Sequence, residues 1–136
     1  MALQPRICID VPDLERAIAF YRDALGLTPG RRLGRKWAEM LGAASPIDLL
    51  AEPAGTPPVP RPEVVRDYRR HWTPVHLDWP VPDLAPALQR AQAAGATLEG
   101  EVLVRKWGRL AVLADPFGNG FCLLEFQGRG YDEMLG

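Results

Sequence analysis

The chain repeats itself with a shift of seventy residues, and this repeat constrains the fold more than any other feature. Val11–Leu14 and Val81–Leu84 both read VPDL, and Arg35–Trp37 and Arg105–Trp107 both read RKW. Further matches in the same register pair Ala17 with Ala87, Ala24 with Ala94, Gly30 with Gly100, Leu33 with Leu103 and, after a four-residue insertion, Ile47–Leu50 with Phe121–Leu124. Several matches in one register indicate two copies of one module.

The first copy predicts a strand, a helix and three further strands. Arg6–Val11 alternates apolar with polar or small residues, which is typical of a strand. Asp13 can cap the helix that follows, and Gly26 is placed to end it in the left-handed conformation. Apolar residues between them fall on one helix face. The strands expected after the helix are Thr28–Leu33, Lys36–Leu41 and Ile47–Glu52.

The second copy predicts the same order of elements. Val75–Val81 has the pattern of a strand, Asp83 can cap a helix that runs to about Ala94, and Gly95 can end it. The strands expected after this helix are Leu98–Val104, Lys106–Ala114 and Gly120–Phe126, the last two joined by the turn Asp115–Asn119. The sequence therefore predicts an α+β fold of two tandem βαβββ modules.

A proline-rich segment separates the two copies. Pro53–Pro62 holds five prolines in ten residues, which excludes a helix interior or a central strand. We expect polyproline II character there, and a helical turn or an ordered loop at Glu63–Trp72. Within a single domain, the predicted divisions are module one at 1–54, a linker at 55–72, module two at 73–128 and a peripheral tail at 129–136.

The composition is that of an ordinary globular chain, with 136 residues, 47% hydrophobic residues and a net charge of -1. This charge gives no electrostatic footprint for nucleic acid or an anionic membrane. No signal peptide and no membrane-spanning run is visible, so we expect a cytoplasmic protein. Cys8 and Cys122 each lie in an apolar run, and we expect both to be buried, free thiols.

Two strand-rich modules also predict where a ligand binds. Each small sheet has one apolar face, which its own helix covers, and a second face of mixed character. Pairing two such sheets forms a curved trough, and a trough of this kind is a natural site for a small molecule.

Three segments carry a family resemblance: VPDLERAIAFYRDALGL (Val11–Leu27), HLDWPVPDL (His76–Leu84) and DPFGNGFCLLEF (Asp115–Phe126). In this order they resemble the vicinal oxygen chelate superfamily, which includes glyoxalase I, bleomycin-resistance proteins, fosfomycin-resistance enzymes, methylmalonyl-CoA epimerase and extradiol dioxygenases. The resemblance covers nearly the whole chain outside the linker and tail. It implies paired βαβββ modules in an open, cup-like mixed sheet, formed within one chain or across a dimer. A homodimer is the expected oligomer.

Metal-dependent members of this superfamily take up to four ligands, from the first and last strands of the two modules. The resemblance places these positions at Arg6, Asp48, His76 and Cys122. Arginine stays protonated, so it cannot ligate a metal and its charge repels a divalent ion. Asp48, His76 and Cys122 match neither an oxygen-rich site nor a site of two histidines and one carboxylate. We therefore expect no metal or other cofactor; if a divalent metal binds, these three residues are its ligands.

The polar residues of the expected cup each allow a functional and a structural interpretation. His76 contacts a ligand or acts as an acid/base catalyst, or it is a hydrogen-bonded histidine that lines the sheet. Asp78 shares the face of His76 and can orient it or pair with Arg6, or it is a carboxylate at the edge of the sheet. Arg6 can bind an anionic group of a ligand, or form a salt bridge with Asp48 or Asp78.

Trp37, Trp107 and Cys122 are less informative. The two tryptophans occupy equivalent repeat positions, either as aromatic walls of a cavity or as core packing beneath each sheet. Cys122 is a nucleophile only if a base lowers the pKa of its thiol, and its apolar strand favours an inert thiol.

These residues predict a bleomycin-resistance-like or glyoxalase-like protein that binds a small organic molecule in the cup without a functional metal. The candidate ligand-binding residues are Arg6, Asp48, His76, Asp78, Trp37, Trp107 and Cys122. The alternative is an enzyme of lyase, isomerase or dioxygenase-like type, either metal-dependent through Asp48, His76 and Cys122 or metal-free with His76 as acid/base. A purely structural or partner-binding module is a third hypothesis. The sequence leaves the choice open and names no ligand.

Overall fold

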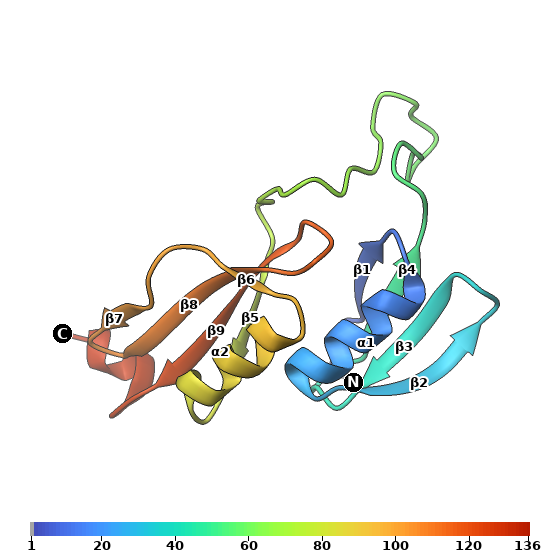
Figure 1. The fold of residues 1–136 in the computed structure, drawn as a ribbon. Helices are drawn as coiled ribbons and strands as arrows, with labels where there is room; N and C mark the ends of the chain where they lie inside the picture. Colours follow the sequence, from blue (N-terminus) through green and yellow to red (C-terminus); the bar gives the residue numbers. More distant parts are fainter. Residues whose placement is uncertain (1) are drawn as a thin grey trace. The chain divides into compact units, whose positions relative to one another are not determined.

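Residues 2–136 are described by a computed structural model of the protein (Figure 1). The chain divides into two compact units, residues 2–69 and residues 70–136, called module one and module two from here on. Each module contains one copy of the repeat, with its own sheet and its own α-helix. The predicted α+β class and the duplicated order of elements are confirmed. No helix of the described residues is long and apolar enough to cross a bilayer.

Module one consists of β1 (Ile7–Val11), α1 (Leu14–Leu25), β2 (Thr28–Leu33), β3 (Trp37–Leu41) and β4 (Ile47–Ala51). Its strands lie in the order β1-β4-β3-β2. β1 pairs with β4 in parallel, and the other two pairings are antiparallel. α1 packs against β3 and β4. The helix therefore covers one face of this sheet.

The ends of α1 follow from the residues that the repeat brings to them. The Asp13 carboxylate accepts a hydrogen bond from the backbone N–H of Arg16 at 3.1 Å, as expected of an N-cap. Gly26 ends the helix with a φ of 71°, a left-handed conformation that glycine adopts without a steric penalty. The buried face of α1 consists of Leu14, Ala17, Ile18, Phe20, Tyr21 and Ala24. Both predicted boundary residues are confirmed.

Module two consists of β5 (Leu77–Pro80), α2 (Leu84–Ala93), β6 (Thr97–Leu98), β7 (Leu103–Arg105), β8 (Gly108–Ala114), β9 (Gly120–Phe126) and a short 3-10 helix, η1 (Gly130–Met134). Its strands lie in the order β5-β9-β8-β6, with β7 also paired to β8. β5 and β9 are parallel, as β1 and β4 are in module one. The turn between β8 and β9 is held by Asp115, whose Oδ1 accepts from the backbone N–H groups of Phe117 and Asn119.

Two predictions for module two are wrong. Leu98–Val104 is not one strand: it divides into β6 and β7, because Gly100 takes a φ of 82° between them. Asp83 makes no side-chain cap hydrogen bond to α2. Glu125 on β9 replaces it, since its Oε1 accepts from the backbone N–H of Leu84 at 2.9 Å.

The two cysteines are free, as predicted, but only Cys122 is buried. Cys8 is exposed, so the expectation that both thiols are buried is wrong for β1. Both cysteines lie in apolar runs of the sequence, but burial of a strand residue depends on whether its face of the sheet is covered, which the run does not reveal.

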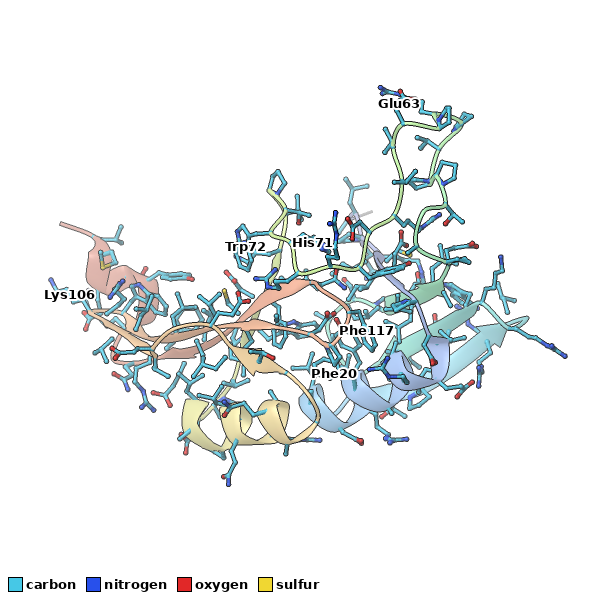
Figure 2. The ribbon with its side chains drawn as sticks, turned by 45° about the horizontal axis from the view of Figure 1, so that its top comes forward. Phe20, Glu63, His71, Trp72, Lys106 and Phe117 are labelled. Carbon is cyan, nitrogen blue, oxygen red and sulfur yellow. The ribbon has the colours of Figure 1, made fainter. Side chains whose placement is uncertain are left out.

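The proline-rich segment and the residues directly after it, 53–66, form a loop of module one that carries no helix or strand (Figure 1). Its two ends are joined by backbone hydrogen bonds from Gly55 to Arg66 and from Arg66 to Thr56. The Arg66 guanidinium also binds Asp10 on β1 at 2.8 Å. The loop is therefore anchored to the sheet at its base, with Glu63 at its far end (Figure 2).

Candidate functional site

The polar centre of module one is an ionic network around Arg6. Arg6 precedes β1, and its guanidinium binds Asp48 on β4 through two hydrogen bonds of 2.9 and 2.7 Å. The same guanidinium binds Glu39 on β3 at 2.7 Å. Glu39 and Asp48 are direct partners in the β3–β4 ladder, so the backbone holds both carboxylates on one face of the sheet. The predicted Arg6–Asp48 salt bridge is confirmed.

Glu39 is shared by two arginines. Arg31 on β2 donates to its two carboxylate oxygens at 3.0 and 2.9 Å. The Glu39 side chain is only 4% exposed, whereas that of Arg6 is 42% exposed. The hydrogen bonds from Arg31 and then Arg6 lower the pKa of Glu39 to about 2. The pKa of Arg6 is raised by its bonds to Asp48 and then Glu39, so the charges of Arg6 and Glu39 persist at neutral pH.

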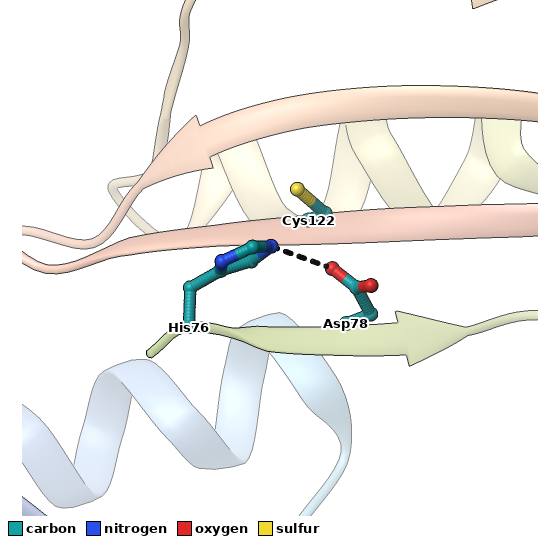
Figure 3. A group of neighbouring side chains, drawn as sticks. All are labelled: His76, Asp78 and Cys122. Carbon is teal, nitrogen blue, oxygen red and sulfur yellow. Dashed lines mark ion pairs between the residues drawn. The ribbon is translucent and has the colours of Figure 1, made fainter. Parts of the chain in front are cut away.

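The equivalent polar centre of module two has a different composition. His76 lies just before β5, Asp78 lies on β5, and Cys122 lies on β9 opposite Asp78 in the parallel ladder. His76 Nε2 is 3.2 Å from Asp78 Oδ1, so Asp78 partners His76, as one of the two sequence interpretations proposed. Figure 3 shows the imidazole and the carboxylate facing each other, with Cys122 beside them on β9.

Trp72 borders this second centre, on the segment that leads into β5 (Figure 2). Its ring lies 4.8 Å from the imidazole of His76, centroid to centroid, with a tilt of 36°. The ring also lies over Gly120 at the start of β9: a Cβ atom at that position would be 2.1 Å from two ring carbons. Arg70 lies over Trp72 at 5.4 Å and binds Glu99. Only a glycine at position 120 leaves room for this arrangement.

Burial, followed by the nearby charge of Asp78 and a hydrogen bond to it, raises the pKa of the Cys122 thiol to about 12. Cys122 is itself only 4% exposed. A thiol with this pKa is protonated near neutral pH, which favours the interpretation of Cys122 as an inert thiol over that of a nucleophile.

The two equivalent tryptophans are in different surroundings. Trp107 precedes β8, and its ring contacts those of Phe126 and Tyr131 at 5.9 and 5.2 Å. The η1 helix, which supplies Tyr131, thus packs against the sheet of its own module through Phe126 on β9. Trp37 is half-buried at the start of β3, paired with Leu50 of β4.

Sequence reasoning missed Glu39 and Trp72 as members of these centres. Glu39 is the one charged residue of β3, and its neighbours Ala38 and Met40 are also buried. A lone acidic residue inside an apolar strand is a signal for a paired, buried charge. Trp72 offered no such signal, because its position depends on the path of the segment before β5.

The two metal positions that the resemblance places in module one hold residues that are poorly suited to ligate a metal. Arg6 stands at the first position, and it has no lone pair to offer. Both oxygens of Asp48 already accept hydrogen bonds from Arg6. Module one therefore supplies a positive charge where a metal would need a ligand.

Comparisons with known proteins agree with this fold. A family model described as a glyoxalase-like domain matches residues 6–124. The chain is 20% identical to a glyoxalase-related enzyme from Fulvimarina pelagi, with a TM-score of 0.70 over 92% of this chain and 88% of that one. It is 17% identical to the fosfomycin resistance protein FosX from Listeria monocytogenes, with a TM-score of 0.71 over 95% and 97%. No curated protein matches the chain. At these identities the solved structures show a shared fold.

Proposed function

Because the chain belongs to the glyoxalase-like family of the vicinal oxygen chelate superfamily, we propose that it binds a small organic molecule with an anionic group, anchored by Arg6. This polar centre suits a binding protein better than a metalloenzyme. The positions in module one that hold metal ligands in metal-dependent relatives are taken here by Arg6 and by Asp48, whose carboxylate is bonded to Arg6. We propose that the protein acts in the cytoplasm, as a homodimer, without a metal between its modules.

The fixed position of Arg6 is the observation that carries this proposal. Two carboxylates hold its Nε and Nη2 atoms, while Nη1 donates no hydrogen bond within residues 2–136. Arginine side chains lose much conformational entropy on binding, and one that is already held loses less. The two remaining N–H groups of Nη1 can donate charge-assisted hydrogen bonds to an oxygen of a carboxylate or a phosphonate. Arg6 is therefore pre-organised for an anionic group.

An enzyme is the second candidate, and the pair His76–Asp78 favours it. A carboxylate 3.2 Å from an imidazole can orient the ring and select its tautomer, which is an arrangement that acid/base catalysis uses. The similar protein FosX has been solved with Mn(II) and 1S,2S-dihydroxypropylphosphonic acid. A phosphonate is accordingly a second probe for the anion anchor.

Thermal shift with matched probes tests the anchor. Benzoate and benzamide have nearly the same shape, but only benzoate carries a charge. We expect benzoate and methylphosphonate to raise the unfolding temperature in the presence of a chelator, and benzamide to leave it unchanged, because ligand binding to the native state stabilises it.

Two variants make this test specific. Arg6→Lys keeps the charge but loses the Nη1 donors that Asp48 and Glu39 hold in place, so it should abolish the benzoate shift. Arg22→Gln, which removes an exposed arginine of α1 paired with Asp23, should leave the shift intact. Equal shifts for benzoate and benzamide, or an unchanged benzoate shift in Arg6→Lys, would contradict the proposal. A benzoate shift lost in His76→Ala would favour the enzyme candidate.

A further inference from the structure

Within residues 2–136, one group of side chains offers at least three metal-ligating atoms, and it lies wholly in module two. It consists of His76, Asp78 and Cys122 (Figure 3). Their ligand atoms, an imidazole nitrogen, a carboxylate oxygen and a sulfur, all lie within 4.8 Å of one another. None of them comes from module one, where Arg6 holds Asp48.

The backbone fixes the three positions. Asp78 and Cys122 are direct partners in the parallel ladder of β5 and β9. His76 comes two residues before Asp78, so both side chains leave the strand on the same face. Trp72, stacked on the imidazole at 4.8 Å, limits the movement of His76. A site built on paired strands keeps its geometry better than one built on loops.

The spacing is close to that of a tetrahedral zinc site. Zinc binds nitrogen and oxygen at about 2.0–2.2 Å and sulfur at about 2.3 Å, which separates neighbouring ligand atoms by about 3.3–3.6 Å. The pair His76 Nε2–Asp78 Oδ1, at 3.2 Å, is close to the lower end of this range. The longest separation within the group is 4.8 Å at most, so tetrahedral spacing requires these atoms to approach one another by no more than about 1.5 Å.

The donor types select the ion. A set of nitrogen, oxygen and sulfur suits Zn²⁺, whereas Mg²⁺ and Mn²⁺ prefer oxygen ligands. Three protein ligands leave the fourth tetrahedral position for water or a bound molecule. A soft sulfur ligand would distinguish this site from the oxygen-rich sites of metal-dependent relatives.

We propose that module two binds Zn²⁺ through the imidazole of His76, the carboxylate of Asp78 and the thiolate of Cys122, with no ligand from module one. The Zn–S bond replaces the S–H bond of Cys122, whose proton is released to water as the metal binds. This inference goes beyond the proposed function and does not depend on it, because benzoate binding is measured with a chelator present. Either proposal can fail without affecting the other.

Cobalt spectroscopy on the full chain tests the site. Co²⁺ occupies tetrahedral zinc sites and gives a sulfur-to-cobalt charge-transfer band in the near ultraviolet when a thiolate ligates it. We expect this band in the chelator-treated wild type, its loss on addition of Zn²⁺, and no change with Mg²⁺. Cys8→Ser is the matched control, since Cys8 is the other thiol of the chain and lies in module one.

Two variants decide the outcome, each with its fold verified by circular dichroism. Cys122→Ser should lose the band, and Cys8→Ser should keep it. Asp78→Asn should keep the band but weaken cobalt affinity by at least about tenfold, so it decides the matter if Cys122→Ser does not fold. Absence of the band in the wild type, its loss in Cys8→Ser, or unchanged affinity in Asp78→Asn would overturn the proposal.

Discussion

Trp72 lies against Gly120, so the effect of Gly120→Ala on stability should change sign when Trp72 is removed. In the native chain, Gly120→Ala would place a Cβ atom 2.1 Å from two carbons of the Trp72 ring. The backbone of Gly120 does not require glycine, because its φ is not positive. The cost of the substitution therefore comes from moving the ring off β9, where it also stacks on His76.

The magnitude follows from the area that the ring buries. Trp72 is 50% exposed, so about half of its surface is covered. A fully buried tryptophan covers about 150–250 Å², and half of that, at about 25 cal/mol per Å², amounts to about 2.5 kcal/mol. Alanine in a strand is itself more stable than glycine by about 0.5–1 kcal/mol. Gly120→Ala should thus destabilise the protein by about 1.5–2 kcal/mol.

A double-mutant cycle separates these two contributions. In a Trp72→Ala background nothing obstructs the new Cβ atom, so Gly120→Ala should become neutral or stabilise the protein by up to about 1 kcal/mol. Urea denaturation followed by far-ultraviolet circular dichroism measures all four proteins without relying on tryptophan fluorescence. A destabilisation of the same size in both backgrounds would refute the contact between Trp72 and β9.

Three further predictions concern single residues. The pKa of Glu39 is lowered to about 2 from its ordinary 4.5, so its ion pairs stabilise the wild type fully above about pH 4.5. This contribution to stability is lost as the pH falls toward 2. The urea midpoints of the wild type and of Glu39→Gln should therefore converge between pH 4.5 and pH 2. Because the pKa of Cys122 is about 12 instead of 9.0, its thiolate fraction is about 1000-fold lower than that of an ordinary thiol. Peptide mapping after brief iodoacetamide treatment, with a chelator present, should therefore find Cys8 modified and Cys122 intact. Gly108→Ala would place a Cβ atom 1.9 Å from a backbone carbonyl oxygen of β9, and it should lower the free energy of unfolding in chemical denaturation by more than about 4 kcal/mol. Gly100→Ala meets nothing within 4 Å, so it should lower this free energy by only about 1–2 kcal/mol, because of the positive φ at that position.

The internal repeat made the fold predictable, because two copies constrain each other's interpretation. The order of elements, both ends of α1 and the last strand of each module followed from local patterns. The repeat did not predict hydrogen-bond partners. Asp13 and Asp83 are equivalent in sequence, yet only Asp13 caps its helix, since Glu125 reaches the first N–H of α2 from a strand forty-one residues away.

The candidate site was predictable to the same limited extent. The pairing of Arg6 with Asp48 follows from residue type and repeat position, and the structure contains it. The participation of Glu39 follows from its register opposite Asp48, which a single strand pattern does not reveal. Equivalent backbone positions hold a guanidinium in one module and an imidazole in the other. The repeat therefore predicted where the polar centres lie, and the residue types determine their different chemistry.

Heteronuclear NMR of the arginine side chains tests the central claim, that Arg6 is a fixed anchor for an anionic group. The Arg6→Lys variant assigns the Nε–H resonance of Arg6, and Arg35, exposed in the turn between β2 and β3, serves as the reference. Since Asp48 and Glu39 hold Arg6, its Nε–H should exchange with water more slowly than that of Arg35, and it should shift on titration with benzoate but not with benzamide. An Nε–H that exchanges as fast as that of Arg35 and moves with neither probe would contradict the account.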